Sequence, residues 1–230
     1  MDLDEIDIRP SQPTLFDLGE SSSGAVELFP ALWQLSEALI SPELTVRRAA
    51  IEQIMELDTA RLLPLVAYLV ATRIIETDLE VRVEVISTLG NVLLPDKEGH
   101  PAPESVRYCL TNYLAEMRTR QIYAMLQVLP DNPDLEPSVA RLLNACPYAG
   151  NQLADILASR RVSLEIRRYA ARLIGLVGYL EAIPAMERQL VRLESRLNGQ
   201  QSMSFAPQET IDDAELIPDI RRALSLLKSP

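Results

Sequence analysis

The stretch Ser163–Gly178, SLEIRRYAARLIGLVG, decides the fold of this chain. Its apolar residues recur at steps of three and four, which places them on one stripe of a helix. These residues are Ile166, Ala170, Leu173, Ile174 and Val177. Ser163 precedes the helix, and we expect its hydroxyl to cap the first turn. Gly175 and Gly178 allow the backbone of a neighbouring element to come close.

An arginine stands second in a pattern that this stretch shares with two earlier ones. The pattern is IRRYAARLIG at 166–175, VRVEVISTLG at 81–90 and VRRAAIEQI at 46–54. Degraded copies occur near Arg120-Gln121 and at Ile220-Arg221. The last gap, of 54 residues, includes a polar loop at 198–208. A period of about 35–47 residues, with two helices in each unit, is typical of a helical solenoid, in which stacked neighbours bury each other's apolar stripes.

These repeated stretches resemble the second helix of HEAT repeats, an armadillo-type helical-repeat family. The resemblance covers residues 25–230 and is weakest at 103–160. It implies an all-α, right-handed α-α superhelix of about five helical pairs, preceded by an acidic segment at 1–24 that we expect to be disordered. It also implies a scaffold or adaptor that binds another macromolecule. In this family the repeated arginines, here Arg47, Arg82, Arg167 and Arg221, join neighbouring repeats.

The helices themselves follow from periodicity and from turn residues. We predict helices at 28–40, 43–57, 58–75, 78–94, 104–117, 119–129, 136–145, 150–159, 163–178, 181–197 and 212–227. Asp78 is expected to cap the helix that follows it. Pro64 marks a kink or a start within 58–75. No segment shows the period-two alternation of a half-buried strand.

The charge of the chain is concentrated in its first part. The formal net charge is −11, and residues 1–100 carry 18 acidic and 7 basic residues. Such an acidic chain is a poor general binder of nucleic acid or of anionic membranes. It contains neither a secretory signal nor an apolar run long enough to cross a membrane. With two cysteines that we expect to be core thiols, it is predicted to be cytoplasmic.

Few residues offer catalytic or metal chemistry. The single histidine, His100, alternates with Asp96 and Glu98 in a polar loop, but this cluster fits no ligand-spacing motif, so we expect neither a metal nor a cofactor. Acidic pairs such as Asp212-Asp213 suit the positive ends of helices. No nucleophile elbow, phosphate loop or Cys-x-x-Cys is present. The chain is therefore predicted to be non-catalytic and to bind a protein.

Candidate contact residues lie on the polar stripes of the second helices. They are Arg48, Glu52, Glu84, Ser87, Arg168 and Arg172. Arg160 and Arg161, just before the helix 163–178, join Arg168 and Arg172 in a candidate positive patch. Helix geometry alone leaves open whether they face a groove or a neighbouring repeat. An alternative function, binding nucleic acid or acting as a lyase or glycosylase with HEAT-like repeats, would use the arginine-rich region 160–196.

The acidic segment contains a short motif. Gln12, Leu15 and Phe16 are similar to the Q-x-x-L-F peptide with which bacterial proteins dock on the replication sliding clamp. A Leu-Phe pair also suits any hydrophobic pocket. The alternative is that Leu15, Phe16 and Leu18 fold back and cover the exposed stripe of the first repeat.

Overall fold

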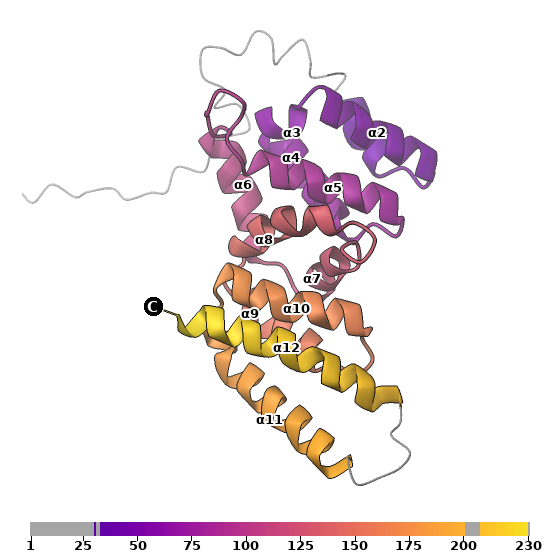
Figure 1. The fold of residues 1–230 in the computed structure, drawn as a ribbon. Helices are drawn as coiled ribbons and strands as arrows, with labels where there is room; N and C mark the ends of the chain where they lie inside the picture. The colour runs from indigo at the N-terminus through magenta and orange to yellow at the C-terminus, as the bar shows by residue number, and fades with distance from the viewer. Residues whose placement is uncertain (1–29, 31–32, 201–207, 230) are drawn as a thin grey trace, which may run out of the picture.

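The structure is a computed structural model that describes residues 30, 33–200 and 208–229. Every regular element among these residues is helical, and they include no β-strand, so the predicted all-α class is confirmed. The ribbon is elongated, with α2 at one end and α11 and α12 at the other (Figure 1). The motif residues Gln12, Leu15 and Phe16 lie outside the described part of the chain.

The helices lie close to the predicted ranges. The first described helical residues are 30 and 33–39. The elements that follow are α2 (Leu44–Glu56), α3 (Thr59–Leu62), α4 (Pro64–Thr72), η1 (Arg73–Ile75), α5 (Leu79–Val92), α6 (Glu104–Ala115), α7 (Thr119–Leu126), η2 (Pro133–Leu135), α8 (Glu136–Asn144), α9 (Ala149–Ala158), α10 (Leu164–Val177), η3 (Leu180–Ala182), α11 (Ile183–Gln200) and α12 (Gln208–Lys228).

Local chemistry explains several of the helix ends. The Asp78 side chain accepts a hydrogen bond from the Val81 backbone N–H at 3.0 Å, which confirms the predicted cap of α5. Gly178 ends α10 with a φ of 90°, a conformation that glycine adopts without a steric cost. The prediction that the Ser163 hydroxyl caps α10 is wrong, because that side chain makes no capping hydrogen bond.

The predicted helix 58–75 is divided into three elements. Pro64 is the first residue of α4, a position whose backbone N–H has no acceptor within the helix, so the N–H that proline lacks is not needed. Proline also favours an extended conformation for the residue before it, and Leu63 adopts one. The chain therefore turns between α3 and α4, and the last residues form the 3-10 helix η1.

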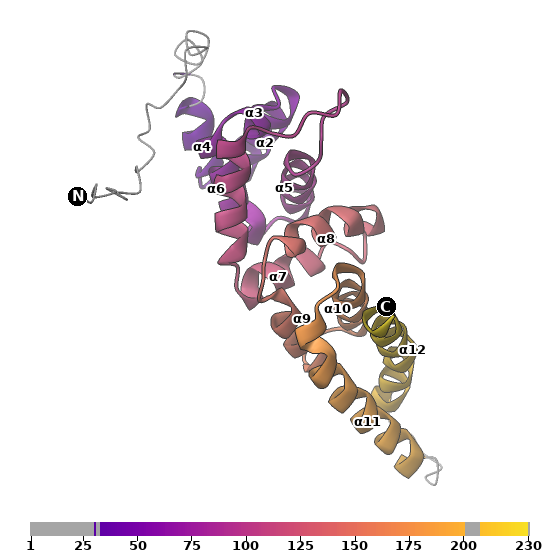
Figure 2. The same ribbon diagram turned by 90° about the vertical axis from the view of Figure 1, so that its left-hand side faces the viewer.

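The helices stack in two rows, which Figure 2 shows side by side. In one row α2 contacts α5, α5 contacts α8, α8 contacts α10 and α10 contacts α12. In the other row α4 contacts α6, α7 contacts α9 and α9 contacts α11. Buried aliphatic side chains from Leu35 to Leu227 form one connected core between and within these rows.

One predicted copy of the arginine pattern is misplaced. We expected a copy at Arg120-Gln121, in α7, but α8 is the helix that packs between α5 and α10. Glu136, the first residue of α8, therefore stands where an arginine stands in the other helices of this row. The intervening helices α6 and α7 both belong to the second row.

Two glycines set the spacing of helices in the first row. A Cβ atom added to Gly90 of α5 would lie 2.6 Å from the Cβ of Ser138 in α8. A Cβ atom added to Gly175 of α10 would lie 2.8 Å from the Cα of Ala223 in α12. Because Ser138 stands two residues after Glu136 and Ala223 two after Arg221, the same register of packing occurs twice.

The close approach at Gly175 predicts whether a substitution there stabilises or destabilises the chain. In an exposed helix, changing glycine to alanine stabilises by roughly 1 kcal/mol. Gly175→Ala should instead lower the free energy of unfolding by about 1 to 3 kcal/mol, because the backbone of α12 cannot move away without loss of packing. Urea unfolding followed by circular dichroism measures this. The control Leu176→Ala, one residue on and exposed, should change stability far less, and a stabilised Gly175→Ala would contradict the packing described.

Candidate interaction surface

The arginine of the repeated pattern bridges elements in each half of the chain. Arg47 of α2 donates from Nε and Nη2 to the carboxylate of Glu76, at 2.9 and 3.0 Å, and from Nη1 to the carbonyl of Ser41. Arg82 of α5 donates to the backbone carbonyl of Glu76 and, at 3.2 Å, to that of Ala124 in the last turn of α7. These contacts link α2, α5 and α7 to the short connection between η1 and α5 that contains Glu76.

The later arginines of the pattern make similar contacts. Arg167 is buried and donates to the carbonyl of Leu157, in the last turn of α9, at 2.9 Å. Arg221 is exposed and pairs with Glu194 of α11 at 2.7 Å. Each of these two side chains thus joins its own helix to the helix that precedes it in the chain.

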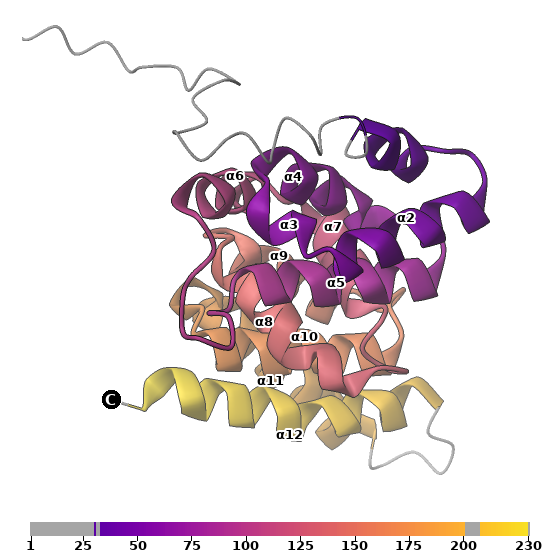
Figure 3. The same cartoon turned by 90° about the horizontal axis from the view of Figure 1, so that it is seen from above.

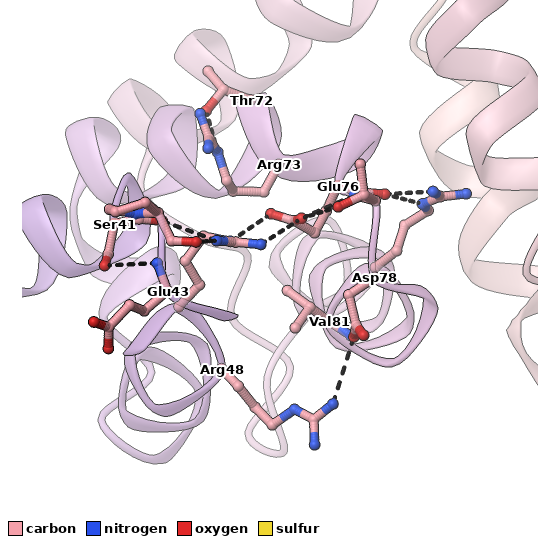
Figure 4. Close-up of polar contacts among 12 residues, drawn as sticks. Ser41, Glu43, Arg48, Thr72, Arg73, Glu76, Asp78 and Val81 are labelled. Carbon is pink, nitrogen blue, oxygen red and sulfur yellow. Dashed lines mark hydrogen bonds and ion pairs between the residues drawn. The ribbon is translucent and has the colours of Figure 1, made fainter. Parts of the chain in front are cut away.

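Glu76 is the centre of this arrangement, and its contacts are drawn in Figure 4. Its side chain is 7% exposed. Burial alone would raise the pKa of the carboxyl group, but the hydrogen bonds from Arg47 and Thr77 outweigh burial and lower the pKa of Glu76 below its usual value. The carboxylate is therefore held in its charged form between elements.

A shallow pocket lies beside Glu76. It has a volume of about 260 Å³ and is lined by Ser41, Arg47, Thr72, Arg73, Ile75, Glu76 and Thr77. The guanidinium of Arg47 already donates to Glu76, Ser41 and Pro42, and Nε of Arg73 donates to the Thr72 hydroxyl at 3.2 Å. Most polar groups that line this pocket are thus already engaged in hydrogen bonds within the chain.

Three of the predicted contact residues form ion pairs between neighbouring helices. Arg48 of α2 lies 2.5 Å from Glu80 of α5 and 3.5 Å from Asp78, which caps α5, and Figure 4 draws it facing Asp78. Arg172 of α10 lies 2.6 Å from Glu136 of α8. These pairs follow the first row of helices along its length.

Arg168 extends the same series. It lies on α10, 2.6 Å from Asp219 of α12. Its guanidinium also lies 3.8 Å from Glu215. Since Arg48, Arg168 and Arg172 face neighbouring helices, their charges are already compensated within the chain.

The remaining predicted contact residues are spread apart. Glu52 is exposed on α2, and Glu84 is half-buried on α5, where burial and the nearby charge of Glu52 raise the pKa of Glu84. Ser87 is half-buried on α5. Arg160 and Arg161 are exposed in the turn between α9 and α10. The structure does not bring these residues together into one site.

The polar loop between α5 and α6 holds the one histidine. Ligand atoms of Asp96, Glu98 and His100 lie within 4.8 Å of one another, and all three side chains are exposed. Asp96 accepts hydrogen bonds from the backbone N–H groups of His100 and Glu98, which lower the pKa of its carboxyl group. Arg61 donates to the carbonyls of Leu94 and His100, so this loop is anchored on α3.

An apolar surface that the sequence analysis missed lies on α3, α4 and α6. We call it the tyrosine surface; it consists of Leu62, Leu65, Tyr68, Tyr108 and Tyr113. Leu65 is 49% exposed, Tyr68 44% and Tyr108 64%. The helices α4 and α6 lie side by side at one edge of the stack (Figure 3). Large apolar side chains are thus exposed to solvent on the neighbouring helices α4 and α6.

One ring contact within the tyrosine surface joins α4 to α6. The rings of Tyr68 and Tyr113 meet edge to face, with centroids 5.7 Å apart and an interplanar angle of 89°. The thiol of Cys109 lies between these helices, 3.5 Å from the carbonyl oxygen of Pro64. The sequence did carry a signal for this surface, because α4 contains no charged residue and so has no strongly polar face to turn to water.

Charge also distinguishes the tyrosine surface from the rest of this half. Residues 58–75 and 104–116, which contain α3, α4, η1 and α6, carry three arginines and three acidic residues. By contrast, α2 together with residues 76–92 carries six acidic residues and three arginines. The apolar side chains therefore lie on the less acidic side of this half.

No protein family, curated protein or solved structure matches this chain. Among the described residues, no helix has both the length and the apolar character needed to cross a membrane. Any account of function therefore depends on the geometry above.

The contacts of Glu76 lead to a prediction about how the stability of the chain depends on pH. Because the pKa of Glu76 is lowered by folding, its contribution to stability is present above the usual carboxyl pKa of 4.5 and is lost as the pH falls through the lower, folded value. Glu76→Gln should cost about 3 kcal/mol at pH 7, since it leaves Arg47 without its charged partner.

Urea unfolding at pH 7 and at several values below 4.5 tests this. The difference between the wild-type chain and Glu76→Gln should shrink as the pH falls. The control Glu80→Gln removes a carboxylate with a side chain that is 74% exposed, and it should cost under about 1 kcal/mol at every pH. A constant difference between wild type and Glu76→Gln would show that the charge of Glu76 is not what stabilises the junction.

Proposed function

We propose that this chain is a HEAT-like helical-repeat scaffold that binds a protein partner through the tyrosine surface. The stacking of two rows supports the repeat arrangement, and so does the recurrence of one packing register at Gly90 and Gly175. The arginines of the pattern add to this support, because Arg47, Arg82 and Arg167 each join their helix to another element.

The observation that carries the binding proposal is the exposure of large apolar side chains on α3, α4 and α6. Large apolar side chains exposed on packed neighbouring helices are costly to leave in water, and such surface in folded proteins often marks interaction sites. Tyrosine is among the residues that dominate the binding energy of protein interfaces, because it offers a large apolar face with a polar tip. The low charge of α4 fits the centre of such an interface.

This proposal moves the contact surface to the first helices of the pairs. The second helices, which we expected to bind, use Arg48, Arg168 and Arg172 in ion pairs with their neighbours. The same pairs weaken the case for a nucleic-acid site in the region 160–196. Acidic side chains that lie 2.6 Å from Arg168 and Arg172 would have to be displaced before phosphates could bind there.

Affinity capture with matched variants tests the proposal. The full chain and Tyr68→Ser/Tyr108→Ser are used to capture proteins from a lysate of the native cells. We expect a protein retained in stoichiometric amount by the full chain and at least 10-fold less by the double variant, since loss of two central tyrosines removes several kcal/mol of binding energy. Mass spectrometry quantifies the retained protein.

The control for this capture is Leu226→Ser. Leu226 lies on α12, far from α4 and α6, and at 53% it is as exposed as Leu65. It should retain the partner at the level of the wild-type chain. Equal retention by wild type and Tyr68→Ser/Tyr108→Ser would refute binding through the tyrosine surface.

A further inference from the structure

The chain itself contains a segment whose chemistry is complementary to the tyrosine surface. Residues 1–29 carry seven acidic residues and one arginine. Within this acidic segment the apolar residues Leu15, Phe16 and Leu18 stand close together. A short acidic peptide with aliphatic and aromatic anchors would suit a surface that combines apolar side chains with positive charge.

Among the described residues of this half of the molecule, that combination occurs beside α4 and α6. Arg73 lies near Tyr113, where its charge lowers the pKa of the phenol although burial raises it overall, and Arg107 is exposed on α6 next to Tyr108. Glu104 is the single acidic residue on α3, α4, η1 and α6. The opposite row presents Glu52, Glu80 and Glu84, which would repel an acidic peptide.

The distance along the chain permits the contact. About 16 residues separate Phe16 from the first residues of the helix at 33–39, and 16 extended residues span at most roughly 50 Å. A tether of this length gives an effective concentration on the order of 1 mM at a nearby site. Even an affinity of about 0.1 mM would then keep the site occupied about nine-tenths of the time.

We propose that residues 12–18 of this chain dock on its own tyrosine surface, with Leu15 and Phe16 as the apolar anchors. This inference rests on the proposed function, because it names the occupant of the same surface. The docked segment would compete with an external partner for the tyrosine surface. It follows that the external partner would present the same chemistry, an acidic peptide with aliphatic and aromatic anchors.

The thiol of Cys109 provides a readout in the full chain. Cys109 is half-buried between α4 and α6, beside Tyr108, whereas the second cysteine, Cys146, is fully buried. A docked segment would cover Cys109 and slow its reaction with a thiol reagent such as Ellman's reagent at pH 8. Leu15→Ser/Phe16→Ser should release the segment and raise the reaction rate about 10-fold, in line with a nine-tenths bound fraction.

A matched control distinguishes loss of docking by residues 12–18 from a general effect of removing apolar residues from the acidic segment. Leu3→Ser/Ile6→Ser removes two apolar residues from the same acidic segment but leaves residues 12–18 intact, so it should react at the wild-type rate. Equal rates for wild type and Leu15→Ser/Phe16→Ser would overturn the docking proposal. A wild-type rate that rises on dilution would also overturn it, because the covering segment would then come from a second copy of the chain.

The two proposals fail in different ways. If Leu15→Ser/Phe16→Ser leaves the thiol rate unchanged while Tyr68→Ser/Tyr108→Ser still loses the partner, docking is refuted and the proposed function stands. If the thiol rate rises as expected but Tyr68→Ser/Tyr108→Ser keeps the partner, docking is supported and partner binding at this surface is refuted. Circular dichroism of each variant confirms that the helices are intact.

Discussion

The structure depends on guanidinium groups that are buried between helices and must find acceptors there. A buried arginine with unmet donors would cost several kcal/mol, so each one has to face carbonyl or carboxylate oxygens. In this chain the acceptors are the carbonyls of last helical turns, such as Ala124 and Leu157, and the carboxylate of Glu76. The position of one helix end is thereby fixed relative to the middle of another helix.

Glycines add a second constraint, which sets the distance between packed helices. Where Gly90 meets Ser138 and Gly175 meets Ala223, the helix backbones approach so closely that a Cβ atom has no room. Arginine contacts set the register of neighbouring helices, and the glycines set their separation. Together these two features explain how a chain with few aromatic residues builds a continuous core from aliphatic side chains.

Periodicity and turn residues in the sequence predicted the all-α class, most helix ranges and the cap at Asp78. The position of the third unit could not be predicted, because Glu136 stands where the pattern has an arginine and because two helices, α6 and α7, fill the second row there. The capping role of Ser163 failed because a suitable residue type does not ensure the hydrogen bond. Ion pairs such as Arg172 with Glu136 join residues 36 positions apart and depend on stacking that periodicity alone does not give.

The tyrosine surface was missed for a related reason. Leu65 and Tyr68 stand three residues apart on a helix without charge, a pattern that also describes core residues. Only the position of α4 beside α6 at the edge of the stack shows that these side chains meet water. The composition of a helix predicts that it has no polar face, but the neighbours of that helix decide which of its residues stay exposed.

The two rows of helices thus differ in what they leave for a partner. Along the first row, charges are paired between successive helices, and breaking such pairs to bind a ligand would cost part of the binding energy. On the second row, Tyr68 and Tyr113 pack edge to face, so these two rings would lose little conformational freedom if the surface were covered. A surface that is apolar, ordered in advance and bordered by arginines favours a ligand that brings its own negative charge, whether that ligand belongs to this chain or to another protein.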